Sequence, residues 1–152
     1  MKVLIQRVSR GAVAVDGKTV GAIGQGFVAL VGVRHGDTVE DARYLAQRTV
    51  NLRIFPDEQG RMNRSLREVN GEVLAVSQFT LYADTRKGNR PGFAQAADPD
   101  VARDLYDAFV AVLRTLLGAG RVATGVFRAS MQVEIINDGP VTITLDTDSR
   151  NE

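Results

Sequence analysis

The chain has 152 residues, of which 44% are hydrophobic and 24% charged, a composition typical of one soluble domain with a buried core. It has no cysteine, which excludes disulfides and thiol catalysis, and its net charge of +1 excludes a strongly basic overall field as the means of binding nucleic acid. No apolar run has the length of a membrane span and the N-terminus becomes polar too early for a signal peptide, so we expect a cytoplasmic protein without membrane association.

The first part of the chain predicts strands. Residues 2–8 and 12–22 are rich in β-branched and aliphatic residues, and Asp16-Gly17 within the second segment is a strong signal for a hairpin turn, because both turn positions take positive φ. Residues 27–33 are nearly all apolar, which is typical of a strand buried on both faces. We therefore expect a hairpin followed by a central strand.

A helix is predicted over residues 39–52, where apolar residues recur at helical spacing. Either Asp37 or Thr38 can cap its N-terminus, and Glu40 stands three residues after Asp37, as in a capping box. After a turn, residues 73–79 are expected to form a second central strand.

The second helix has clearer boundaries. Asp98 suits the N-cap, and Pro99 suits the first helical position, where its missing N–H costs nothing. Gly118 or Gly120 is expected to end the helix. Three further strands are then predicted, over residues 121–127, 130–136 and 141–146.

The predicted order is two strands, strand–helix twice, then three strands. Two helices can cover one face of a sheet, so the other face must be covered by β-structure or by a partner chain. We expect a single α/β domain over residues 1–147, with mixed sheets in an α/β/β layered arrangement. The polar residues 148–152 are expected to be a frayed tail.

Two polar segments are not explained by turns alone. Residues 77–93 run from the end of a predicted buried strand into a basic loop, and strand ends are frequent places for functional sites. Residues 137–142 contain Gly139-Pro140, a candidate for a cis peptide bond in a tight turn.

These segments resemble the signature motifs of the D-aminoacyl-tRNA deacylase family. Residues 77–81, Ser-Gln-Phe-Thr-Leu, match a Ser-Gln-x-x-Leu motif, and Gly139-Pro140 matches a Gly-Pro motif with a cis bond. The likeness extends through nearly the whole chain, including residues 6–10, 51–55, 62–63 and 137–145. It implies a homodimeric hydrolase that removes D-amino acids from tRNA, and glycine mischarged on tRNA-Ala, without a cofactor or a metal.

Two positions depart from the family pattern. The resemblance leads us to expect Ser where this chain has Gly92, and Gly or another small residue where it has Arg128. Both departures bear on substrate range and rate more than on the class of reaction.

The residues offer few groups for acid–base catalysis. His35, the single histidine, falls in a strand-to-helix turn and is expected to be an exposed loop residue; with no cysteine, it also argues against a zinc site. The resemblance implies that the Ser77–Thr80 segment acts through backbone N–H groups near Gln78 and Phe79, which would stabilise the oxyanion, while the 2′-hydroxyl of the terminal adenosine helps to activate water. Thr80 either positions the substrate or takes part directly.

Gly139-Pro140 has two interpretations. On sequence alone it is a β-turn. The resemblance implies instead that a fixed backbone carbonyl reaches the partner's site and clashes with an L side chain while tolerating hydrogen, which is selection by steric exclusion. Arg7 would support the partner's Gly-Pro loop, or is an exposed strand arginine, and Asn137 belongs to the same motif as a supporting residue.

Several residues near the first motif carry similar alternatives. Arg86, Lys87 and Arg90 either contact tRNA phosphates or belong to a solvated loop. Phe79 and Met131 either wall a pocket for the terminal adenosine or belong to the core. A second hypothesis for the whole chain is a nucleic-acid-binding module that keeps the fold without catalysis, and a purely structural protein is a third.

Overall fold

Strand β1 (Lys2–Val15) organises the fold in the computed structural model, which describes residues 1–151. It pairs antiparallel with β2 (Lys18–Ile23), β3 (Gly26–Gly32) and β8 (Gln132–Asp146). The sequence predicts two strands here, but the chain continues through Ser9 without a break because β8 pairs with both Val8 and Arg10. Gly11 suits the point where β1 pairs with both β2 and β8, since a Cβ there would lie 2.7 Å from Val28 Cγ2.

The sheet is mixed, as predicted, with the strand order β2-β1-β3-β6-β7 and β8 joined to β1. Strands β3, β6 (Glu72–Ser77) and β7 (Val122–Thr124) run parallel. Parallel neighbours need a crossover connection, and α1 (Val39–Asn51) and α2 (Pro99–Leu117) supply the two crossovers. A short hairpin of β4 (Phe55–Pro56) and β5 (Met62–Arg64) follows α1.

The sequence prediction of two separate C-terminal strands is wrong. Residues 132–146 form one strand that carries a bulge: β8 pairs Asn137 with Val8 and Thr142 with Gln6, so Arg7 alone opposes residues 138–141. A continuous β1 gives both halves the same partner, and the segment between them is therefore pushed out of the ladder.

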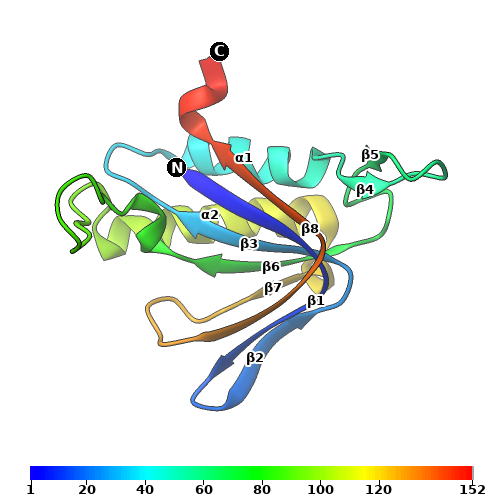
Figure 1. Ribbon diagram of the computed structural model, residues 1–152, viewed down its shortest axis with the longest axis horizontal. Coiled ribbons are helices and arrows are strands. Elements are labelled where there is room, and N and C mark those ends of the chain that lie inside the picture. The colour runs from blue at the N-terminus through cyan, green and yellow to red at the C-terminus, as the bar shows by residue number, and fades with distance from the viewer. Residues whose placement is uncertain (152) are drawn as a thin grey trace.

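Two hydrophobic cores give the predicted α/β/β layering. The larger lies between the helices and the central strands, where Phe27 and Phe55 stack and Phe109 and Leu113 of α2 are fully buried. The smaller lies on the other face, where β2 and the first half of β8 fold over β3 and β6. Figure 1 shows both helices on one side of the sheet and this β-layer on the other.

Both helices begin close to their predicted positions. At α1, Thr38 forms a capping box with Asp41 rather than Asp37 with Glu40. Asp37 instead accepts hydrogen bonds from the α-ammonium group of Met1 and the backbone N–H of Arg34, each at 2.8 Å. At α2, Asp98 is the N-cap and Pro99 follows it, and Gly118 ends the helix with a φ of 95°. No helix among the described residues combines the length and apolar character needed to cross a membrane.

The expectation of a frayed tail concerns residues 148–152, of which Glu152 lies outside the described residues. Residues Thr147–Asn151 form a 3₁₀ turn, η3. The guanidinium of Arg34 pairs with the carboxylate of Asp148, and the guanidinium of Arg150 lies 4.7 Å from the ring centroid of Tyr44. Arg34, in the connection between β3 and α1, and Tyr44 of α1 thus contact the turn, an arrangement that local polarity does not reveal.

Candidate functional site

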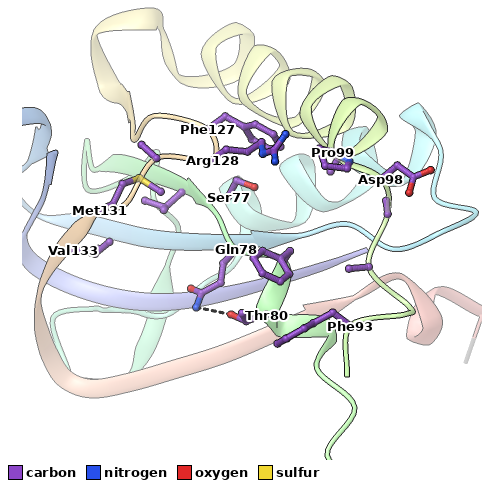
Figure 2. Close-up of a pocket in the computed structure, with 16 residues that line it drawn as sticks. Ser77, Gln78, Thr80, Phe93, Asp98, Pro99, Phe127, Arg128, Met131 and Val133 are labelled. Atoms are coloured by element: carbon purple, nitrogen blue, oxygen red, sulfur yellow. Dashed lines mark hydrogen bonds between the residues drawn. The ribbon is translucent and has the colours of Figure 1, made fainter. Parts of the chain in front are cut away.

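A pocket of about 620 Å³ opens at the C-terminal end of β6. Its walls come from the segment after β6, the first turn of α2 and the connection between β7 and β8. Figure 2 shows Ser77, Gln78 and Thr80 on one side and Met131 on another. The structure thus brings the Ser77–Thr80 motif and Met131, which lie far apart in the sequence, to one cavity.

The path of the pocket-lining segment Ser77–Thr80 is set by the point at which the β3–β6 ladder ends. The backbone N–H of Gln78 donates to the carbonyl of Val31 at 2.8 Å, which is the last ladder bond. The chain then leaves the sheet as a 3₁₀ turn, η1 (Phe79–Tyr82), where the sequence predicts that the strand continues to Phe79. The predicted strand overlaps η1 at Phe79, whose apolar side chain continues the pattern of the strand.

The turn leaves two backbone donors without partners. The N–H groups that begin a helical turn have no intrahelical acceptor. Within residues 1–151 no acceptor is found for the N–H groups of Phe79 and Thr80, whereas the N–H of Leu81 donates to Gln78 O at 3.4 Å. The resemblance led us to expect donors near Gln78 and Phe79; the N–H of Gln78 is bound to the sheet, and the free N–H groups of the described turn are those of Phe79 and Thr80.

The hydroxyl of Thr80 has an amide as its neighbour. Gln78 Nε2 donates to Thr80 Oγ1 at 3.0 Å, the bond drawn in Figure 2. An amide cannot take a proton from a hydroxyl, and a threonine nucleophile needs an adjacent base. In the described part of the chain this amide is the sole hydrogen-bond partner of the hydroxyl, so the geometry favours a positioning role.

Aromatic and apolar side chains form the walls. Phe79 is 55% exposed and meets Phe93 edge to face, with ring centroids 5.0 Å apart. Met131 is half-buried, lines the pocket and also packs against the smaller core; its contact with a terminal adenosine stays a prediction. Phe93 and Phe127 also line the pocket and were not singled out from the sequence. Phe93 is the last residue of the polar segment 77–93, and an aromatic residue in that segment could have indicated its place in the pocket.

Arg128 lines the same pocket from the β7–β8 connection. Its backbone has a φ of 66°, a conformation that glycine adopts without steric cost and that other residues rarely adopt. This explains in physical terms why glycine suits the position.

The Gly139-Pro140 segment lies in the bulge of β8, away from this pocket. The Gly139-Pro140 peptide bond is cis, and both residues are exposed. Asn137 spans the base of the bulge: its Oδ1 accepts from the N–H of Val141 at 2.7 Å and its Nδ2 donates to the carbonyl of Val141 at 3.1 Å. Neither Gly139 nor Pro140 is among the described residues that line the pocket of the same chain.

Arg7 supports the bulge through hydrogen bonds from its guanidinium. Its Nε donates to the carbonyl of Asp138 at 2.9 Å, and its Nη1 donates to the carbonyl of Ile54 at 2.6 Å. Arg7 therefore ties the bulge of its own chain to the short segment between α1 and β4. The resemblance led us to expect support for a partner's loop, and the intrachain contact follows because Arg7 is the β1 residue that faces residues 138–141.

The basic residues form a separate loop. Asp84 and Gly92 exchange backbone hydrogen bonds of 2.7 and 2.9 Å, which close the loop, and Arg86, Lys87 and Arg90 line a hollow of about 570 Å³ beside them. The Arg86 guanidinium binds the carboxylate of Asp84 through Nε at 2.9 Å and Nη2 at 2.8 Å. Lys87 and Arg90 are exposed and form no ion pair with any described residue.

Groups suited to acid–base or metal chemistry are sparse. His35 is exposed in the turn before α1, as predicted, and its backbone N–H donates to the carbonyl of Gln95 at 3.1 Å. Within residues 1–151, no three His, Cys, Asp or Glu side chains come together in a way that could hold a metal ion.

The chain is similar to proteins of one family over nearly its whole length. The model of the family described as D-Tyr-tRNA(Tyr) deacylase matches residues 4–146. The D-aminoacyl-tRNA deacylase of Heliobacterium modesticaldum is 61% identical over 96% of both chains, and that of Thermomicrobium roseum is 58% identical over 97% of this chain and 94% of its own. These matches define a class of hydrolases that act on aminoacyl esters of tRNA.

Two solved structures share the fold. One, described as a c-Myc DNA unwinding element binding protein, has a TM-score of 0.92 and 40% identity, with 97% of this chain and 99% of its own covered. The other, described as a probable eukaryotic D-amino acid tRNA deacylase, has a TM-score of 0.79 at 22% identity, with 95% and 97% covered, and shows the likeness of fold alone. The chain belongs to the D-Tyr-tRNA(Tyr) deacylase family.

The Asp84–Arg86 pair gives a prediction on pH. The hydrogen bonds from the Arg86 side chain and backbone lower the pKa of the Asp84 carboxyl from 3.8 to about 2. A lowered folded-state pKa means that the pair is intact above about pH 4 and is lost as the pH falls through about 2. Carbon-13 NMR titration of the carboxyl should show this value, and Arg86→Ala should raise it toward 3.8, with Arg86→Lys intermediate. A pKa that stays near 2 in Arg86→Ala would show that the Arg86 side chain is not its cause.

Proposed function

We propose that the protein hydrolyses the ester of D-aminoacyl-tRNA and of glycyl-tRNA, including glycine mischarged on tRNA-Ala, and leaves L-aminoacyl-tRNA intact. The observation that carries this is the pair of unpartnered N–H groups of Phe79 and Thr80 in a pocket with aromatic walls. The family membership supports the substrate class. The terminal adenosine lies between Phe79 and Met131, and no cofactor is required.

In the proposed reaction, water attacks the ester carbonyl and forms a tetrahedral oxyanion. The N–H groups of Phe79 and Thr80 donate to that oxygen, and one such donor stabilises a transition state by about 2.7–4 kcal/mol. The 2′-hydroxyl of the terminal adenosine passes a proton from the attacking water to the departing 3′-oxygen. The carbonyl–oxygen bond then breaks, and the products are the free amino acid and tRNA. Ser77 and Gln78 position the segment, and neither supplies a general base.

Chiral selection requires a second copy of the chain. The bulge of β8 is exposed and braced by Arg7 and Asn137, yet it does not line the pocket of its own chain. We propose that in a homodimer each bulge enters the partner's pocket. There the backbone carbonyl of Gly139 or Pro140 faces the α-carbon, where an L side chain would clash and a hydrogen fits.

The basic loop is the proposed contact for tRNA phosphates. Lys87 and Arg90 carry positive charge that no described carboxylate neutralises, whereas Arg86 already binds Asp84. Lysine and arginine contacts to phosphate position nucleic acid without reading its sequence. A cytoplasmic location accords with this substrate and stays a proposal.

A second candidate is a nucleic-acid-binding module without catalysis. A protein 40% identical over nearly the whole chain is described by its binding to a DNA element, which favours nucleic-acid binding of some kind on this fold. Turnover separates the two candidates, since both bind tRNA and only one cleaves the ester.

The direct test is deacylation of D-tyrosyl-tRNA, L-tyrosyl-tRNA and glycyl-tRNA side by side. We expect loss of the D-tyrosyl and glycyl esters at rates well above spontaneous hydrolysis, with the L-tyrosyl ester unchanged. Equal cleavage of the D and L esters would keep the esterase and contradict the steric argument. Binding of tRNA with no cleavage of any ester would favour the module.

The role of Thr80 is tested by Thr80→Val, which keeps the shape and the backbone N–H and removes the hydroxyl. We expect kcat to fall by about fivefold, because one neutral hydrogen bond is worth about 1 kcal/mol. A loss of about a thousandfold or more, as found when a nucleophile is removed, would make Thr80 a direct participant.

The homodimer is tested by sedimentation equilibrium at micromolar concentration. We expect twice the chain mass of 16.5 kDa. A monomer that still discriminates D from L esters would contradict the proposal that the bulge acts on a partner's site.

A further inference from the structure

Arg128 has a guanidinium that the rest of the described chain does not engage. The residue is exposed and lines the pocket, and within residues 1–151 its side chain forms no hydrogen bond and no ion pair. In Figure 2 it reaches from the β7–β8 connection toward the first turn of α2, on the side of the pocket away from Thr80 and Phe93. Its left-handed backbone, with φ at 66°, holds the side chain there at a conformational cost that glycine would avoid.

Arg128 is the positively charged side chain among the described residues that line the pocket. Among the described lining residues the other charged side chain is Asp98, which repels anions and makes no capping hydrogen bond. Arg103 of α2 lies nearby but its guanidinium stacks over the ring of Phe127 at 5.0 Å, and it does not line the pocket. An anion that reaches this side of the pocket therefore meets Arg128.

We propose that Arg128 binds the phosphate that joins the terminal adenosine of tRNA to the preceding nucleotide. The inference rests on the proposed function: an adenosine held between the apolar walls must carry its 5′-phosphate out through the mouth of the pocket. A guanidinium presents paired N–H donors that match two phosphate oxygens. Arg128 is thus a specificity-determining residue that distinguishes an ester carried on RNA from the same ester on a nucleoside.

The proposed role is ground-state binding and not chemistry. The phosphate carries the same charge before and during ester hydrolysis, so its contact contributes equally to the substrate and the transition state. Uniform binding of this kind lowers KM and leaves kcat unchanged. The basic loop with Lys87 and Arg90 is a separate contact, since none of these residues lines this pocket.

The test compares Arg128→Ala with the unaltered protein on two substrates, D-tyrosyl-tRNA and D-tyrosyl-adenosine, which lacks every phosphate. With the tRNA we expect KM to rise about tenfold, the size of one charge-assisted hydrogen bond, and kcat to stay within twofold. With the adenosine ester both constants should be unchanged. Arg128→Lys should retain part of the effect. The matched control is Arg67→Ala, which removes the same charge from an exposed site at the opposite end of β6 and should alter neither substrate.

Binding of uncharged tRNA gives a readout that does not depend on turnover. Arg128→Ala should weaken binding about tenfold and should reduce the slope of log affinity against log salt by about 0.7, the value for one phosphate on a single strand. If the unaltered protein cleaves no D ester, the proposed function fails, and this salt slope still decides whether Arg128 contacts phosphate.

Three outcomes would overturn the inference. An equal rise in KM with both substrates would mean that Arg128 shapes the nucleoside pocket. A fall in kcat with KM unchanged would place it in the chemical step. If Arg128→Ala raises KM for D-aspartyl-tRNA and leaves KM for D-tyrosyl-tRNA unchanged, the guanidinium binds the side-chain carboxylate of the amino acid instead of the phosphate.

Discussion

The hydrogen bond from the N–H of Gln78 to the carbonyl of Val31 is the constraint on which the site depends. It is the last bond of the parallel β3–β6 ladder, and everything after it must turn away from the sheet. Because the turn is 3₁₀ from Phe79 onward, two consecutive N–H groups are left without acceptors beside an apolar cavity. A site of this kind needs no imidazole or thiol nearby, which accords with a chain that has one exposed histidine and no cysteine.

A second constraint comes from the length of β1. A single strand of fourteen residues pairs with both halves of β8, so four residues of β8 that do not fit the register are expelled as a bulge. Arg7 and Asn137 then fix the expelled segment by hydrogen bonds to its backbone. One strand therefore pairs with β3, the neighbour of the pocket-lining β6, and also with β8, which carries the bulge outside the pocket of the same chain.

Much of the fold could be predicted from local patterns. Helix α2 follows from Asp98, Pro99 and its apolar stripe, and the hairpin follows from Asp16-Gly17, both of which take positive φ. The errors arose where distant residues decide the outcome. Residues 138–141 have the composition of a turn, and they form a bulge because of the strand with which their neighbours pair. Asp37 is a residue type that often caps helices, but its carboxylate accepts hydrogen bonds from the ammonium group of Met1 and the backbone N–H of Arg34 instead.

The candidate site was predictable only in part. The Ser77–Thr80 segment and Gly139-Pro140 were found through resemblance, because the chemistry proposed for them lies in backbone groups that carry no residue-type signature. The meeting of Met131 with Phe79 in one pocket depends on the parallel placement of β6 and β7, which no local pattern contains. The occupied N–H of Gln78 depends on the register with Val31, so the identity of the free donors had to come from the structure.

The most direct measurement is a crystal structure with a D-tyrosyl group joined by an amide to 3′-amino-adenosine, a stable mimic of the ester. The account predicts that the carbonyl oxygen lies about 2.7–3.1 Å from the backbone nitrogens of Phe79 and Thr80, a distance typical of oxyanion-hole donors. It also predicts that the Gly139-Pro140 bulge of a second copy faces the α-carbon. A carbonyl oxygen bound elsewhere, or an α-carbon that no second copy approaches, would contradict it.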